Sequence, residues 1–120
     1  MKITSVLCVA AFVLVAIPTA YAAGNEADVS QTGKGNQAGI GQVGKGNYSG
    51  IGQVGKKNEA VSLQAGKGNV SGIGQFGKKN EALTVQAGKG NVSGTLQFGK
   101  YNDATTVQVG KGNSSVIVQH

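Results

Sequence analysis

The sequence predicts an all-β fold, a two-sided parallel β-solenoid of the cross-β, amyloid-forming kind. Three observations lead to this fold class: nine glutamines and nine asparagines each recur every eleven residues, the residues beside them alternate with a period of 22, and a Gly-Lys pair follows most of these glutamines. Each eleven-residue unit corresponds to one strand and one turn. Two units then form a coil of 22 residues with strand-turn-strand-turn order, and nine units form about 4.5 coils.

The repeat runs through residues 23–120 without an interrupting linker. Its half-repeats begin at Asn25, Asn36, Asn47, Asn58, Asn69, Asn80, Asn91, Asn102 and Asn113. Equivalent residues of successive coils stack about 4.8 Å apart, so their amide groups can bond the coils above and below. The predicted amyloid ladder consists of Gln31, Asn36, Gln42, Asn47, Gln53, Asn58, Gln64, Asn69, Gln75, Asn80, Gln86, Asn91, Gln97, Asn102, Gln108, Asn113 and Gln119.

Within each unit, the residues from asparagine to glutamine alternate with period two, as in a strand whose two faces differ. We expect the inward face of one unit to carry Asn36, Ala38, Ile40 and Gln42. From this unit onward, the second residue after asparagine is Ala or Ser, and the fourth is Ile, Thr or Ser. These side chains suit a thin core between two sheets. The glycine two places after a glutamine can adopt a positive φ and so permits a tight return.

Residues 1–22 resemble a Sec signal peptide rather than part of the repeat. Lys2 precedes an apolar run that ends at Pro18, and Ala20-Tyr21-Ala22 forms an A-x-A cleavage pattern. The run is about fifteen residues long, which is short for a permanent transmembrane helix, so we expect no stable membrane span. Cys8 lies inside this run, so the mature chain that starts at Ala23 would contain no cysteine and no disulfide.

The chain is basic, with a formal net charge of +6, and its lysines follow the same period. One edge of the predicted solenoid carries Lys34, Lys56, Lys78 and Lys100, and the other carries Lys45, Lys67, Lys89 and Lys111. Columns of like charge one strand spacing apart repel each other unless counter-ions or polyanions bind along them. Two interpretations stay open: the columns bind extracellular DNA or acidic polysaccharide, or the lysines are solvated residues that limit aggregation.

The end of the repeat suggests how copies associate. Residues 114–119 form a β-prone strand without charge or proline, and such an exposed edge templates the addition of another chain. We expect a homopolymer in which this last half-coil receives Asn25 to Gln31 of the next copy. The outward residues also differ between alternate strands: Val61 and Leu63 contrast with Gly50 and Gly52. We therefore expect fibres to bundle through the more apolar sheet.

Other classes of function fit the sequence less well. The pattern Gly39-x4-Gly44-Lys45 imitates a phosphate-binding loop but lacks the following Ser or Thr, so we interpret it as a by-product of the repeat. No converging set of Cys, His or acidic residues is evident, and we expect no catalytic site, metal site or cofactor. A monomeric ice-binding β-solenoid would need an outward row of threonines, whereas we assign Thr84, Thr95 and Thr106 to the inward face.

The spacing Gln31-x4-Asn36-x5-Gln42 recurs as far as Gln108-x4-Asn113-x5-Gln119. It resembles the repeat S-x5-Q-x4-N-x5-Q of the curlins, which are the subunits of bacterial curli fibres. Two departures are asparagine in the place of the usual serine and the lack of a separate targeting stretch before the first repeat. The regularity favours the major, polymerising subunit, whereas the basic charge is also typical of the minor subunit that nucleates the fibre.

The curlin resemblance implies a structural, non-enzymatic subunit of an extracellular functional amyloid fibre. Such a subunit is secreted to the cell surface, assembles end to end, and contributes to biofilm matrix, cell adhesion and surface attachment. The partners implied are further copies of the chain, the other curlin subunit and an outer-membrane secretion pore.

Overall fold

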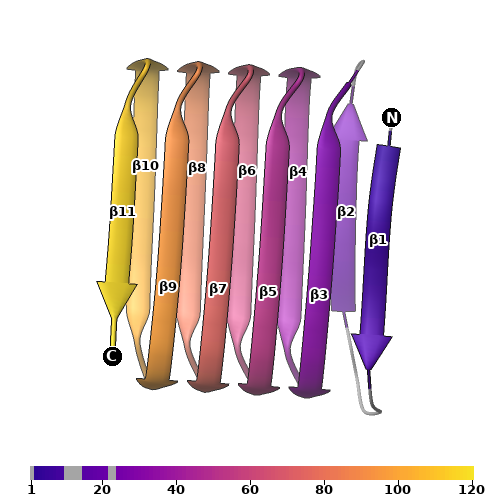
Figure 1. Ribbon diagram of the computed structural model, residues 1–120, viewed down its shortest axis with the longest axis vertical. Helices are drawn as coiled ribbons and strands as arrows, with labels where there is room; N and C mark the ends of the chain where they lie inside the picture. The colour runs from indigo at the N-terminus through magenta and orange to yellow at the C-terminus, as the bar shows by residue number, and fades with distance from the viewer. Residues whose placement is uncertain (1, 10–14, 22–23) are drawn as a thin grey trace.

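The computed structural model describes residues 2–9, 15–21 and 24–120, with side chains for residues 24–120. These residues form eleven strands and no helix (Figure 1). The strands are β1 (Lys2–Val9), β2 (Val15–Tyr21), β3 (Glu26–Lys34), β4 (Gln37–Lys45), β5 (Tyr48–Lys56), β6 (Glu59–Lys67), β7 (Val70–Lys78), β8 (Glu81–Lys89), β9 (Val92–Lys100), β10 (Asp103–Lys111) and β11 (Ser114–Gln119). Strands β3 to β11 correspond to the nine predicted units, and each begins directly after its asparagine.

The strands build two parallel sheets that lie back to back (Figure 1). Sheet A contains the odd-numbered strands in the order β1-β3-β5-β7-β9-β11, and sheet B contains the even-numbered strands in the order β10-β8-β6-β4-β2. Strands of sheet A run in the direction opposite to those of sheet B, as the arrowheads in Figure 1 show. The chain therefore changes sheets at every turn, which confirms the predicted two-sided β-solenoid with a 22-residue repeat.

Strands β1 and β2 lie where the signal peptide was predicted. They extend sheets A and B by pairing with β3 and β4. The pairing of β1 with β3 contains a register shift between Ile3 and Ser5. Strand placement does not bear on cleavage, so removal of residues 1–22 stays a prediction.

From β3 to β11 every pairing joins a residue to the residue 22 positions later, without a shift in register. Gln53, for example, pairs with Gln31 on one side and with Gln75 on the other. Strict register places identical side chains in columns perpendicular to the strands. The sequence period thus becomes a set of straight columns in space.

The core between the sheets is thin and unusually polar. Its apolar part consists of Ala27, Val29, Ala38, Ile40, Ile51, Ala60, Ile73, Ala82 and Ala104. The remaining core positions are buried Asn, Gln, Ser and Thr side chains. Buried polar groups are tolerated only where they are hydrogen-bonded, so the stability of this core depends on where its amides bond.

The turns explain why one glycine column is invariant within the repeat. Gly55 has a φ of 129°, and a Cβ atom there would collide with the carbonyl oxygen of Gly77 in the next coil. The left-handed residue two places later is less restricted, because a side chain at this position points into open space. This left-handed residue is glycine at every turn of one edge. At three turns of the other edge it is Lys57, Lys79 or Tyr101, with φ values of 56°, 56° and 61°.

Candidate functional site

The glutamine columns form continuous side-chain ladders. The Nε2 of each glutamine donates to the Oε1 of the glutamine 22 residues later, as in Gln53 to Gln75 at 2.7 Å and Gln64 to Gln86 at 2.8 Å. The same bond recurs from Gln31 to Gln119, with one ladder in each sheet. Because both partners are shielded from water in most coils, each bond also avoids the cost of burying an unpaired amide.

The second hydrogen of the glutamine Nε2 crosses the core. Gln53 donates to the carbonyl oxygen of Gln37 at 2.8 Å, and Gln75 donates to that of Glu59 at 2.8 Å. The acceptor lies 16 residues earlier, at the start of a strand in the opposite sheet. Each such glutamine therefore links its own strand to the next coil and to the facing sheet.

The asparagine columns bond to the backbone instead. The Nδ2 of Asn69 donates to the carbonyl of Ala65, four residues earlier, at 3.1 Å, and so holds the turn between β6 and β7. Its Oδ1 accepts from the backbone N–H of Asn91 at 3.1 Å. The same two contacts recur along both columns. The asparagine amides therefore bond the adjacent coil through its backbone and not through each other.

The glutamine ladders have a direction, and their two ends differ. All Nε2 donors point toward the later coils, so acceptors remain at the beginning of each ladder. Among the described residues, Gln31 Oε1 and Gln42 Oε1 are buried and have no hydrogen-bond partner. The residues that pair with Gln31 and Gln42 in β1 and β2 are Cys8 and Ala20, which carry no amide. The first two strands therefore do not continue the ladders.

Hydroxyl groups occupy several inward positions between the asparagine and glutamine columns, and their bonding is less regular. Ser49 Oγ and Ser62 Oγ lie 2.8 Å apart across the core. Within residues 24–120, the hydroxyls of Ser71, Thr84, Ser93, Thr95 and Thr106 are buried without a hydrogen-bond partner. The three threonines therefore face inward, as expected, and do not form the outward row that an ice-binding surface requires.

The lysines lie on the two edges of the solenoid and are exposed. Lys34, Lys56, Lys78 and Lys100 pair in register on one edge, which we call the double-lysine edge, and Lys45, Lys67, Lys89 and Lys111 do so on the other. The double-lysine edge also carries Lys57 and Lys79, which replace turn glycines. Lys79 Nζ lies 3.4 Å from the Tyr101 hydroxyl and 5.1 Å from the centre of its ring.

Among the described residues, no group of three or more His, Cys, Asp and Glu side chains could hold a metal ion. The same part of the chain contains no helix with the length and apolar character needed to cross a membrane.

Comparison with protein families identifies the repeat. The family model described as curlin associated repeat matches residues 23–55, which include two complete half-repeats and most of a third. No curated protein matches the chain at a significant level. The unit in the matched segment recurs unchanged in spacing as far as Gln119.

Curlin-repeat proteins are structural rather than enzymatic, and the family implies self-polymerisation into an extracellular fibre. The solenoid has stacked columns of amides, which add to the stability of cross-β assemblies. The chain therefore contains a match to the curlin associated repeat over residues 23–55.

Proposed function

We propose that this protein is the subunit of an extracellular functional amyloid fibre that grows end to end and contributes to biofilm matrix, cell adhesion and surface attachment. Residues 1–22 direct export and are removed, and the mature chain leaves the cell through an outer-membrane secretion pore. The observation that carries the proposal is the direction of the glutamine ladders, because it makes one end of the solenoid an acceptor and the other a donor.

The acceptor end contains two buried oxygens, Gln31 Oε1 and Gln42 Oε1, that have no partner among the described residues. At the opposite end, Gln108 and Gln119 carry the last Nε2 donors of the two ladders. A second copy stacked on the first would bring donors and acceptors together and continue both ladders. Such a joint also pairs the open backbone edges of β10 and β11, which is the contact by which cross-β fibres grow.

Assembly of the chain without residues 1–22 tests this function. We expect thioflavin-T-positive fibres with a meridional reflection at about 4.8 Å, because strands stack at that spacing. Removal of residues 113–120 takes away the last half-coil and should slow growth sharply, whereas removal of His120 alone should leave the rate unchanged. Equal growth of the two truncated chains, or assembly without the meridional reflection, would contradict the proposal.

Within the fibre we assign the chain to the major, polymerising subunit. Its coils repeat without interruption, so a copy offers the same columns at each end as in its middle. The alternative is the minor subunit that nucleates the fibre. Seeds of this protein should then shorten the lag of a separate polymerising curlin, while the protein alone should form few long fibres.

A second proposed function is binding of extracellular DNA or acidic polysaccharide along the double-lysine edge. This edge carries six lysines in four coils, since Lys57 and Lys79 add to the in-register column. Phosphate or carboxylate groups bound along it would relieve the repulsion between like charges. Lys57→Gly with Lys79→Gly restores the residue found at the equivalent turns of the other edge. We expect these fibres to bind DNA more weakly and with less salt dependence than wild-type fibres; equal binding would instead favour a role in limiting aggregation.

A further inference from the structure

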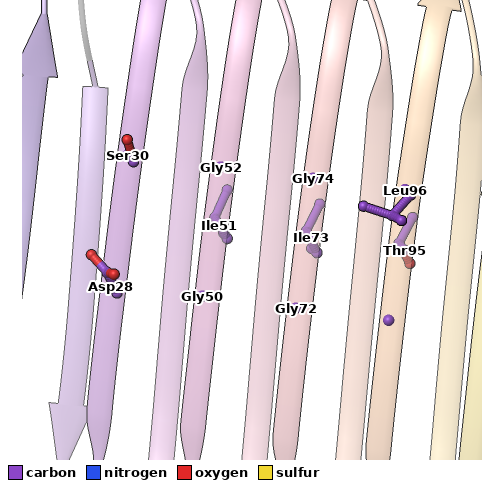
Figure 2. Close-up of a pocket in the computed structure, with 11 residues that line it drawn as sticks. Asp28, Ser30, Gly50, Ile51, Gly52, Gly72, Ile73, Gly74, Thr95 and Leu96 are labelled. Atoms are coloured by element: carbon purple, nitrogen blue, oxygen red, sulfur yellow. The ribbon is translucent and has the colours of Figure 1, made fainter.

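The outward surface of sheet A contains a straight groove that runs across the strands (Figure 2). Its floor consists of glycines at two adjacent outward positions, Gly50, Gly52, Gly72 and Gly74, and its volume is about 530 Å³. Ile51 and Ile73 alternate with these glycines and point into the core. None of the four floor glycines has a positive φ, so their backbone does not require glycine.

Two rows of apolar side chains border this groove. One row, at the start of the strands, contains Tyr48, Val70 and Val92, and the other, near their ends, contains Val54, Phe76 and Phe98. All six side chains are exposed. The Phe76 and Phe98 rings stack with centroids 5.1 Å apart, which stiffens the second row. Leu96 extends from β9 over Gly74 and closes the groove on that side (Figure 2).

The outward surface of sheet B has the opposite relief. Where sheet A carries the glycine floor, β6 and β8 carry a ridge of Val61, Leu63, Leu83 and Val85. Beside this ridge lies a second, smaller groove of about 250 Å³ in which the outward side chains of β6 and β8 are Ala65 and Ala87. Each relief extends over two adjacent coils, because β5 and β7 pair in register in sheet A and β6 and β8 pair in register in sheet B.

The two surfaces fit each other when sheet B of one copy faces sheet A of another. Since the strands of the two sheets run in opposite directions, the outward positions of the two facing surfaces follow each other in reverse order. One register along the strands then places Gly50 and Gly52 opposite Leu63 and Val61. The ridge that includes Leu63 and Val85 meets the glycine floor. The row of Tyr48, Val70 and Val92 meets the groove that contains Ala65 and Ala87. Two ridges thus enter two grooves in a single contact.

Charge selects the relative orientation of the two copies. The first outward position of β6, β8 and β10 is acidic: Glu59, Glu81 and Asp103. With the strand stacks of both copies running in the same direction, this acidic column lies beside the in-register lysines that end the strands of sheet A in the other copy. In the reversed orientation, the lysines that end β6 and β8 would face those same lysines. Like charges at such short range repel each other. The orientation in which both strand stacks run in the same direction is therefore favoured.

From these observations we propose that the ridge of sheet B docks in the glycine groove of sheet A of a second copy, and that this contact joins fibres side by side. The inference rests on the proposed fibre and names the partner surface for bundling. Exposed apolar surface on both outer faces would be covered by this contact, as in other protein interfaces. The contact is heterologous, so each fibre retains a free ridge and a free groove on opposite sides, and bundles can grow further.

A matched pair of glycine substitutions tests the docking. A Cβ atom at Gly72 on sheet A has no neighbour within 4 Å, and one at Gly39 on sheet B has only a Val61 methyl at 3.9 Å. Valine therefore fits the solenoid at either site. We expect Gly72→Val to fill the groove and lower the bundled fraction about tenfold in electron micrographs, because overpacking disfavours a close contact. Gly39→Val extends the ridge and should leave bundling unchanged.

Mixing distinguishes this contact from a symmetric one. Val85→Lys fibres lose the ridge but keep the groove, and Gly72→Val fibres lose the groove but keep the ridge. Each variant alone should give single fibres, whereas a two-colour mixture should give pairs that contain one fibre of each kind. Bundling of either variant alone, or wild-type fibres that stay single, would overturn the docking. Loss of the meridional reflection in wild-type protein would instead overturn the proposed fibre.

Discussion

Glutamine and asparagine carry the same amide group, yet the two columns in this solenoid act differently. Gln75 bonds side chain to side chain along the stack and also reaches Glu59 in the opposite sheet. Asn69 bonds only to backbone, at the turn before it and at the next coil. The extra methylene of glutamine explains the difference, because it extends the amide across the thin core. Glutamine therefore holds the sheets and coils together, whereas asparagine shapes the turns.

The largest effect is expected from removing an interior glutamine amide. Gln75→Leu leaves the Nε2 of Gln53, the Oε1 of Gln97 and the carbonyl of Glu59 without their partner. Unpaired buried polar groups cost about 1–3 kcal/mol each, so we expect a loss of roughly 3 kcal/mol or more in the free energy of subunit release. The measurement is the guanidinium concentration that dissociates half of the fibres. Gln37→Leu, at an exposed position outside the period, is the control and should change little.

A smaller effect is expected from lengthening an asparagine. Asn69→Gln keeps the amide but displaces it from the carbonyl of Ala65 and from the N–H of Asn91. We expect a loss of about 1–2 kcal/mol, since two hydrogen bonds to backbone are weakened while the amide can still find a partner in its column. Slower hydrogen exchange of the Asn91 amide in the variant than in wild type would contradict the role of asparagine at the turn.

The smallest effect is expected in the hydroxyl column. Ser71 Oγ is buried without a hydrogen-bond partner in the described part of the chain, so Ser71→Ala removes an unsatisfied group and should leave stability within about 0.5 kcal/mol or raise it slightly. Ser49→Ala is the matched comparison, because it breaks the 2.8 Å contact with Ser62 and should cost about 1 kcal/mol. A larger loss of stability from Ser71→Ala than from Ser49→Ala, in the same guanidinium assay, would contradict this prediction. The Ser71 hydroxyl would then stabilise the fibre as the amides do.

Much of the fold follows from the period alone. All nine strands after residue 24 begin beside their predicted asparagine, and the alternation from Asn36 to Gln42 correctly predicts which side chains are buried. Turn glycines such as Gly55 were predicted to adopt positive φ, and they do. The prediction succeeds because one repeated rule of register decides every pairing. A chain without such a repeat offers no comparable constraint.

Several features of the site could not be predicted in this way. The bond from Gln53 to the carbonyl of Gln37 depends on how the two sheets face each other, which a sequence offset of 16 residues does not reveal. Lys57 and Lys79 occupy turn positions that are glycine on the other edge, and their left-handed backbone is seen only in the structure. The structure also gives residues 2–9 and 15–21 strands that the apolar pattern of a signal peptide did not predict.

The repeat in the sequence is enough to specify the solenoid, its 22-residue coil and the identity of its columns, because side-chain period and strand register both follow from it. What each column does depends on how the two sheets face each other. Side-chain length and the distance across the core send the glutamine amide to the opposite sheet and keep the asparagine amide at the turn. The outer surfaces also depend on the fold. The outward glycines of sheet A form a groove only because the coils stack in register.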